Sequence, residues 1–237
     1  MKGKLFLIPA PLGENATHSL PVYTVEILNS LQHFIAERAK TARHYIKAVL
    51  PEKSLPDLEF FELNEHTDAA EVAGFLKPAL KGLDMGLLSE AGCPGVADPG
   101  ARAVRLAHEL GIEVVPLVGP SSILLALMAS GMNGQRFTFH GYLSAKRPEM
   151  ARDLKRLEQL SARQDQTEVF IEAPYRNEAV LETALQSLEP GTWFGVAADL
   201  TLPSQFILTR RIADWRKLPK PELHKRPVVF MVYAGKG

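Results

Sequence analysis

The segment from Met85 to Gly100 constrains the fold of this chain more than any other stretch. An apolar run, Met85–Leu88, passes directly into a loop rich in glycine and proline. Apolar residues then recur at helical spacing, and Asp98 and Pro99 are typical of an N-cap and a first helical position. The segment therefore predicts a buried strand, a rigid loop and a helix. In open α/β sheets, such loops surround the ligand at the carboxyl ends of the strands.

Two further loops of small residues follow predicted strands. Val118–Ser122 lies between an apolar strand, Ile112–Leu117, and an apolar helix that starts at Ile123. Pro9–Gly13 follows the first strand, Lys4–Pro9. An ordinary tight turn of a parallel sheet explains each loop taken alone. The three loops together predict one ligand, bound mainly by backbone groups that small residues leave accessible.

Strands and helices alternate through residues 1–133, which predicts a parallel sheet with helices on both faces. The five expected strands are Lys4–Pro9, His33–Ala36, Leu58–Leu63, Met85–Leu88 and Ile112–Leu117, and the expected helices include Pro21–Leu31, Arg38–Leu50 and Ala69–Leu80. Beyond Gly131–Gly134, consecutive strands without intervening helices indicate mixed or antiparallel pairing. We therefore expect an α/β protein of two domains, residues 1–133 and a smaller mixed-sheet domain at 134–237.

Composition limits the class of protein. The 237 residues are 46% hydrophobic and 23% charged, as is typical of soluble globular proteins. The single cysteine, Cys93, excludes an internal disulfide and a cysteine-cluster metal site, and it indicates a reducing compartment. No apolar run reaches the roughly 18 residues of a membrane helix, and the N-terminal run is too short for a signal peptide. We expect a cytoplasmic protein without a metal or a membrane partner.

The net charge is zero, but the charges are unevenly distributed. Residues 1–133 hold 11 Lys and Arg against 15 Asp and Glu, whereas residues 201–237 hold 8 against 2. A solvated surface explains such a local basic excess in most proteins. A binding surface for a polyanion is the alternative.

Several common catalytic and nucleotide-binding motifs are missing from the sequence. There is no G-x-G-x-x-G after the first strand, no P-loop and no G-x-S-x-G elbow, and the histidines lack the spacing of a zinc site. Carboxylates do stand where strands are expected to end, at Glu37, Glu90, Glu172 and Asp199. The sequence therefore offers small-residue loops for a ligand and acidic side chains beside them.

The loop Ser89-Glu-Ala-Gly-Cys-Pro-Gly-Val-Ala-Asp-Pro-Gly100 resembles the S-D-A-G-x-P-x-x-x-D-P-G signature of the tetrapyrrole-methylase superfamily, in its branch of 16S ribosomal RNA 2′-O-ribose methyltransferases. Further segments resemble motifs of that branch in the same order. They are Ile8-Pro-Ala-Pro-Leu-Gly13, Gly119-Pro-Ser-Ser122, Phe139-His-Gly-Tyr-Leu143 and Glu172-Ala-Pro-Tyr-Arg176. These matches extend over nearly the whole chain. They are specific to the superfamily and less specific to the substrate.

The resemblance implies S-adenosyl-L-methionine as cofactor, bound in a cleft between the two domains, and a homodimer. It implies that the cofactor-binding residues are Pro11, Glu90, Ala91, Gly92, Cys93, Val96, Ser121, Ser122, Glu172 and Leu200. Strand-end amides, serine hydroxyls and an apolar surface suit a sulfonium donor that carries a carboxylate and an adenine. Methyl transfer is an in-line displacement, so catalysis is chiefly positioning, with a base only where the acceptor loses a proton.

The acceptor side departs from the family pattern at two places. Where the ribosomal RNA enzymes have E-D-T-R, this chain has Glu37-Arg-Ala-Lys40, and where they have R-E-L-T-K, it has Ala198-Asp-Leu-Thr-Leu202. We select Glu37, Lys40, Arg176 and Asp199 as candidate catalytic residues. Helix capping, solvent exposure and structural ion pairing also explain these side chains without a catalytic role.

We therefore expect a methyltransferase that uses S-adenosyl-L-methionine and acts on RNA or a ribosomal subunit. The loops of the ribosomal branch and the basic C-terminal end favour this substrate. Methylation of a small acceptor such as a tetrapyrrole is an alternative. A cofactor-binding protein that has lost catalysis is another, because two acceptor-side motifs differ from the family pattern.

Overall fold

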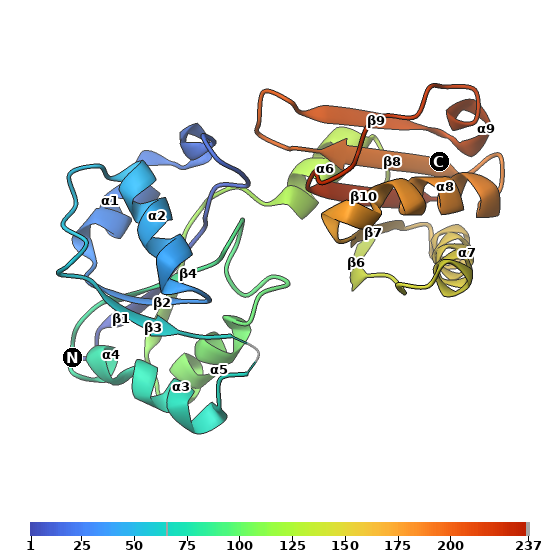
Figure 1. Cartoon of the computed structure of the whole chain (residues 1–237). Coiled ribbons are helices and arrows are strands. Elements are labelled where there is room, and N and C mark those ends of the chain that lie inside the picture. The colour runs from blue at the N-terminus through green and yellow to red at the C-terminus, as the bar shows by residue number, and fades with distance from the viewer. Residues whose placement is uncertain (65, 236–237) are drawn as a thin grey trace. The chain divides into compact units, whose positions relative to one another are not determined.

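The chain forms two compact units, Met1–Ser121 and Ser122–Gly237, each built around one five-stranded sheet (Figure 1). The computed structural model describes residues 1–64 and 66–235. Within these residues, none of the helices combines the length and the apolarity that crossing a bilayer requires. Within residues 1–64 and 66–235, no three His, Cys, Asp or Glu side chains are grouped so that they could hold a metal ion.

The first sheet is entirely parallel, in the order β3-β2-β4-β1-β5. Its strands are β1 (Lys4–Ile8), β2 (His33–Ala36), β3 (Glu59–Glu62), β4 (Met85–Leu88) and β5 (Glu113–Pro116). The parallel sheet that the sequence predicts is thereby confirmed. Because the strands are parallel, their carboxyl ends all lie at one edge of the sheet.

Helices cover both faces of the first sheet, as Figure 1 shows. The helices are α1 (Val22–Ser30) and α2 (Ala39–Val49) on one face, and α3 (Ala69–Phe75), α4 (Lys77–Leu80) and α5 (Ala101–Glu109) on the other. A short 3-10 helix, η1 (Thr17–Ser19), precedes α1. Side chains alternate along each strand, so Phe34 packs with α1 and α2, while its neighbour Ile35 packs with the helices of the opposite face.

The single helix expected at Ala69–Leu80 is divided in the structure. α3 ends at Phe75, and α4 begins at Lys77 with a proline in its first turn, Pro78. A proline has no amide hydrogen, and its ring excludes the preceding residues from an uninterrupted helical turn. The division therefore follows from Pro78, which the sequence-based expectation did not take into account.

The second sheet is mixed, in the order β6-β7-β10-β8-β9. β6 pairs in parallel with β7, and every other pair is antiparallel. The strands are β6 (Phe137–Tyr142), β7 (Thr167–Ile171), β8 (Trp193–Ala198), β9 (Phe206–Arg211) and β10 (Val228–Tyr233). The mixed pairing confirms the expectation, although this sheet has as many strands as the first.

One face of the second sheet carries the main core of this unit, with Phe170, Phe230 and Trp215 fully buried. The helices of this face are α7 (Arg147–Gln164), α8 (Asn177–Ser187) and α9 (Ile212–Trp215), and a 3-10 helix, η2 (Pro174–Arg176), precedes α8.

α6 (Ser122–Ser130) packs against β8, β9 and β10 and belongs to the second unit. A Cβ atom on Gly195 would lie near Met132, just after α6, whereas Phe194 belongs to the core of the other face. α6 therefore covers the opposite face. Because α6 packs on the second sheet, the chain passes from the first unit to the second at Ser121–Ser122. The boundary expected from the sequence lies later, at Gly131–Gly134.

Replacing Trp215 by alanine should destabilise the second unit. The indole is 1% exposed, donates from Nε1 to the carbonyl of Phe194 over 2.8 Å, and packs edge-on against the Phe194 ring. Trp215→Ala should lower the free energy of unfolding by about 3–5 kcal/mol, measured by urea denaturation followed by circular dichroism. Tyr23→Ala, which truncates an aromatic side chain that is 59% exposed, should change it by less than about 0.5 kcal/mol.

Candidate active site

Three loops at the carboxyl edge of the first sheet are held to one another by a pair of backbone hydrogen bonds and a thiol contact. Ala10, after β1, and Gly92, after β4, exchange two amide-to-carbonyl hydrogen bonds of 2.9 Å each. The thiol of Cys93 lies 3.5 Å from the carbonyl of Pro120, after β5. The structure therefore brings together the loops that hold Pro11, Glu90–Cys93 and Ser121.

Two glycines allow this close approach. Gly92 has a φ of +70°, which residues with a Cβ rarely adopt. A Cβ on Gly119 would lie 2.4 Å from Cβ of Pro9, and neither the backbone nor the proline ring can yield by that distance. The β5 loop can rest on the β1 loop only because position 119 has no side chain.

The loop after β4 is held rigid by its own side chains. The hydroxyl of Ser89 donates to the carbonyl of Gly92 over 2.7 Å. The Asp98 carboxylate accepts the amides of Gly95 at 3.0 Å and Gly100 at 2.7 Å. The rigid loop predicted from the sequence is present, and its main-chain groups are fixed without a ligand.

The start of the helix after this loop differs from the expectation. α5 begins at Ala101 with Gly100 as its N-cap, not at Pro99 with Asp98 as the N-cap. The Asp98 carboxylate accepts hydrogen bonds from amides of the loop, so it stabilises the loop and is not the N-cap of the helix. Sequence alone does not separate these two roles, because both use an aspartate that accepts from nearby amides.

Cys93 is half-buried within this loop. Burial raises the pKa of its thiol, which keeps the sulfur protonated. A protonated thiol is a poor nucleophile, and the position therefore suits a small packing residue.

Two helices support the loops from one face of the sheet, and the sequence analysis missed both contacts. The Tyr45 hydroxyl on α2 donates to the carbonyl of Pro9 over 2.9 Å, and burial holds the pKa of this phenol well above its usual value. The Thr24 hydroxyl on α1 donates to the carbonyl of Val118 over 2.8 Å. A polar residue on an otherwise apolar helix face was the available signal, since buried polar groups find partners.

Glu37, after β2, and Glu90, after β4, form an acidic pair at the same edge. Burial raises the pKa of Glu90, and the Glu37 carboxylate raises it further, whereas the Thr41 hydroxyl and Arg38 lower it. Two of the four strand-end carboxylates expected from the sequence, Glu37 and Glu90, are therefore neighbours in space. Thr41 and Arg38 complete the group and were not singled out from the sequence.

Lys40 lies in the first turn of α2 and is exposed. No side-chain partner of Lys40 occurs among the residues that the structure describes. The amide of Ala39 beside it is bound by the Glu62 carboxylate over 2.8 Å. Arg43, which shares a helix face with Lys40, instead covers the ring of Phe60 at 4.6 Å. Lys40 is thus available for a ligand.

In the second unit, Glu172 and Arg176 form a buried ion pair at the carboxyl end of β7. Nη2 of Arg176 lies 2.9 Å from Oε2 of Glu172, and Oε1 accepts the amide of Ala173 over 2.7 Å. Arg176 also donates to the carbonyl of Ser144, after β6, over 3.0 Å. The arginine therefore ties two loops together, which gives it a positioning role.

Asp199 follows β8 and is fixed by a cation that the sequence analysis missed. Its Oδ2 accepts Nε of Arg226 and the hydroxyl of Ser204, each over 2.8 Å. Asp199 and Thr201 both have positive φ values, +50° and +72°. Left-handed backbone is costly for a β-branched residue and clusters at functional sites. Leu200, between them, is buried.

Thr201 also holds a buried hydroxyl oxygen with no hydrogen-bond partner among the residues described. Buried polar atoms of this kind are rare in native structures. The β8–β9 loop therefore combines backbone strain with an unsatisfied polar atom, and both make it a candidate functional segment.

Solved structures share this fold. The chain superposes on the methyltransferase CobJ with a TM-score of 0.63 at 21% identity, over 98% of this chain and 94% of that one. It superposes on the uroporphyrin-III C-methyl transferase of Thermus thermophilus complexed with S-adenyl homocysteine with a TM-score of 0.56 at 15% identity, over 98% and 97%. The chain therefore has the fold of this class of α/β methyltransferase structures.

Sequence comparison places the chain within that class. The family model of tetrapyrrole (corrin/porphyrin) methylases matches residues 4–215, and the chain belongs to this family. Ribosomal RNA small subunit methyltransferase I of Escherichia coli O157:H7 is 30% identical over 200 residues, 84% of this chain and 66% of the relative. The protein of that name from Bacillus subtilis (strain 168) is 32% identical over 186 residues, 78% and 60%. The aligned part is less than two thirds of either relative.

Replacing Glu90 by glutamine should stabilise the protein at neutral and alkaline pH. Because the folded-state pKa of Glu90 is raised, its ionised form destabilises the folded state above that pKa, and the penalty vanishes below the unfolded value of about 4.3. Glu90→Gln should therefore raise the Tm by roughly 1–3 °C at pH 8 and leave it unchanged near pH 4.

Thermal melts at several pH values would measure this difference. Glu52→Gln, which removes an exposed carboxylate in the turn after α2, is the matched control and should show no such pH-dependent gain. A lower Tm for Glu90→Gln at pH 8 would contradict the repulsion between Glu37 and Glu90.

Proposed function

We propose that this chain is a methyltransferase that transfers a methyl group from S-adenosyl-L-methionine to the RNA of the small ribosomal subunit. The family and the shared name of the two bacterial relatives support the reaction and the substrate. The observation that carries the proposal is the set of three backbone loops pinned at the carboxyl ends of parallel strands.

The cofactor would be held chiefly by main-chain atoms. The residues of the first unit that would hold it are Pro11, Glu90, Ala91, Gly92, Cys93, Val96 and Ser121. When bound, the sulfonium supplies an electrophilic methyl group. The rigid amides and carbonyls suit its carboxylate and adenine, and the Glu37–Glu90 pair provides negative charge for a cation. The Thermus thermophilus neighbour binds S-adenyl homocysteine, the demethylated form of this donor.

Side chains of this protein would accept the proton, contact the RNA and position the loops. Glu37 is the proposed acceptor of the proton from a ribose hydroxyl, the acceptor group that the family resemblance implies. Lys40, exposed at the start of α2, would contact an RNA phosphate. Arg176 and Asp199 act by positioning, since both are committed to ion pairs that fix loops of the second unit.

Methylation of a small acceptor such as a tetrapyrrole is the second candidate function. The solved structure from Thermus thermophilus supports this function, because it is named a uroporphyrin-III C-methyl transferase. The replacement of charged family residues by Ala198 and Leu202 also leaves the acceptor side less suited to phosphates.

Methyl transfer onto ribosomes would test the proposed function. The purified protein and tritiated S-adenosyl-L-methionine should label small-subunit RNA from cells that lack the protein, and RNA from cells that contain it should accept little label. Label on extracted tetrapyrroles instead of RNA would favour the second function. Donor binding without any transfer would leave only a cofactor-binding protein.

Gly119→Ala separates the role of the loops from general effects on folding. The added Cβ would collide with Pro9, so donor affinity measured by calorimetry should fall by about tenfold or more. Gly134→Ala adds the same methyl group where no atom lies within 4 Å and should leave affinity unchanged. Equal affinities for both variants would contradict a donor site built on these loops.

We further propose that the protein works as a homodimer in the cytoplasm, where ribosomal RNA is found. Large apolar side chains on the second unit support an interface, since Met128 on α6 is 79% exposed and Tyr142 on β6 is 65% exposed. Sedimentation equilibrium should give about twice the chain mass of 26.1 kDa. Met128→Glu should lower that mass toward one chain, and a wild-type mass of one chain would exclude the dimer.

A further inference from the structure

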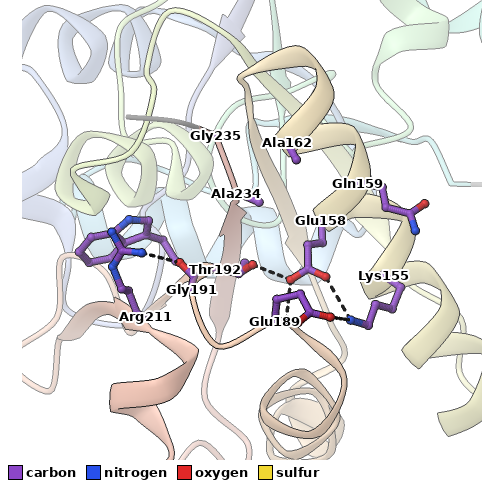
Figure 2. A pocket seen from close by; sticks show the side chains of 11 residues that line it. Lys155, Glu158, Gln159, Ala162, Glu189, Gly191, Thr192, Arg211, Ala234 and Gly235 are labelled. Atoms are coloured by element: carbon purple, nitrogen blue, oxygen red, sulfur yellow. Dashed lines mark hydrogen bonds and ion pairs between the residues drawn. The ribbon is translucent and has the colours of Figure 1, made fainter.

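The second unit contains a pocket that the proposed reaction does not use. Its volume is about 660 Å³, within the range of small-molecule sites. It lies where β8 begins and where β9 and β10 end, beside the C-terminal half of α7 (Figure 2). Asp199 and Leu200 follow the other end of β8. Six strand residues span about 20 Å, so the pocket is remote from these loop residues.

The floor of the pocket is polar, and its one lysine and two glutamates are bonded to one another. Nζ of Lys155 lies 2.8 Å from Oε1 of Glu189 and 3.3 Å from Oε2 of Glu158. The other oxygen of Glu158 accepts the Thr192 hydroxyl and the amide of Glu189. Figure 2 shows Glu158 at the centre of this network. Because these groups satisfy one another, an uncharged ligand can bind without leaving a buried charge unpaired.

A flat platform stands at one end of the pocket. The guanidinium of Arg211 lies over the Trp193 ring, 4.9 Å from its centroid, and Nη1 donates to the carbonyl of Gly191 over 3.0 Å. Arg211 is thereby held in one orientation. Aromatic rings and arginine planes are the surfaces on which proteins stack unpaired nucleobases.

A free amide stands at the other end. In Figure 2, Gln159 and Arg211 lie on opposite sides of the group of lining residues, with Thr192 and Glu158 between them. Gln159 is exposed and has no hydrogen-bond partner among the described residues. Glutamine amides commonly bind the sugar and phosphate groups of nucleic acids.

Basic side chains flank Gln159 along α7. Arg163 follows it by four residues and Arg156 precedes it by three, so all three share one side of the helix. Arg163 is exposed, and within the described residues its side chain is unpaired. Arg156 makes only a long contact of 3.9 Å with Asp153. A strand whose base enters the pocket could place its phosphates against this side of α7.

We propose that this pocket binds one unstacked nucleobase, with the base on the Trp193–Arg211 platform and its sugar or phosphate at Gln159. The nucleobase comes from a single-stranded segment of RNA or from a free nucleoside. The RNA source rests on the proposed function and adds to it a docking point at the edge of the second sheet opposite Asp199. The floor, whose charged groups are paired with one another, accommodates the uncharged base, and the arginines of α7 accommodate the strand.

Binding of a short fluorescein-labelled single-stranded RNA, followed by anisotropy without methyl donor, would test the pocket. Arg211→Ala and Gln159→Ala should each weaken binding by about five- to tenfold, the lower part of the range for loss of one stacked base. Arg210→Ala and Gln164→Ala are matched controls. Arg210 and Arg211 are adjacent on β9 and point to opposite faces, and Gln164 is exposed on α7 outside the pocket.

Competition with unlabelled adenosine and cytidine distinguishes the two sources. Displacement of the RNA by millimolar nucleoside, lost in Arg211→Ala, assigns the pocket to free nucleosides, and resistance to it assigns the pocket to an RNA strand. The proposal is overturned if neither probe binds, or if Arg211→Ala and Arg210→Ala weaken binding equally. Because the assay contains no methyl donor, failed methyl transfer with Arg211-dependent binding would count against the proposed function alone.

Discussion

The pair of hydrogen bonds between Ala10 and Gly92 is the contact on which the candidate active site depends. It joins two loops that carry few large side chains and could not be held together by packing. Every nearby feature serves this contact: Gly119 lets the third loop approach, Tyr45 holds the carbonyl of Pro9, and Asp98 closes the loop after β4. A site made of backbone atoms is specific only where that backbone is fixed, and here side chains from the helices do the fixing.

In the second unit, side chains also fix the loops at the strand ends. Here ion pairs take the place of the backbone hydrogen bonds. Arg176, paired with Glu172, links the end of β7 to the loop after β6, and the Asp199–Arg226 pair links the end of β8 to the segment before β10. The motif that the sequence resemblance implies around Asp199 contains an arginine and a lysine, and this chain has Ala198 and Leu202 at those positions. Arg226, which precedes β10, supplies a cation to Asp199 from elsewhere in the sequence. The departure from the motif therefore does not leave the carboxylate unpaired.

Much of the fold could be read from the sequence because local signals and tertiary packing agree. Strand and helix alternation predicted the parallel sheet, and closely spaced strands predicted mixed pairing in the second. The prediction failed where a residue has two local roles or where packing decides. Asp98 could cap either helix or loop, Pro78 divides a helix whose apolar pattern is continuous, and α6 joins the second unit through contacts with strands far along the chain. Tyr45 and Arg226 lie far in sequence from the groups they bind, so spacing could not pair them with Pro9 and Asp199.

The network of Lys155, Glu158, Glu189 and Thr192 has a thermodynamic consequence for the second unit. Its polar groups form ion pairs and hydrogen bonds with one another, so folding does not require a ligand to satisfy them. A cavity of this kind can fill and empty without loosening the walls around it. The occupancy of the pocket would depend on the ligand concentration. The protein without ligand would keep its stability.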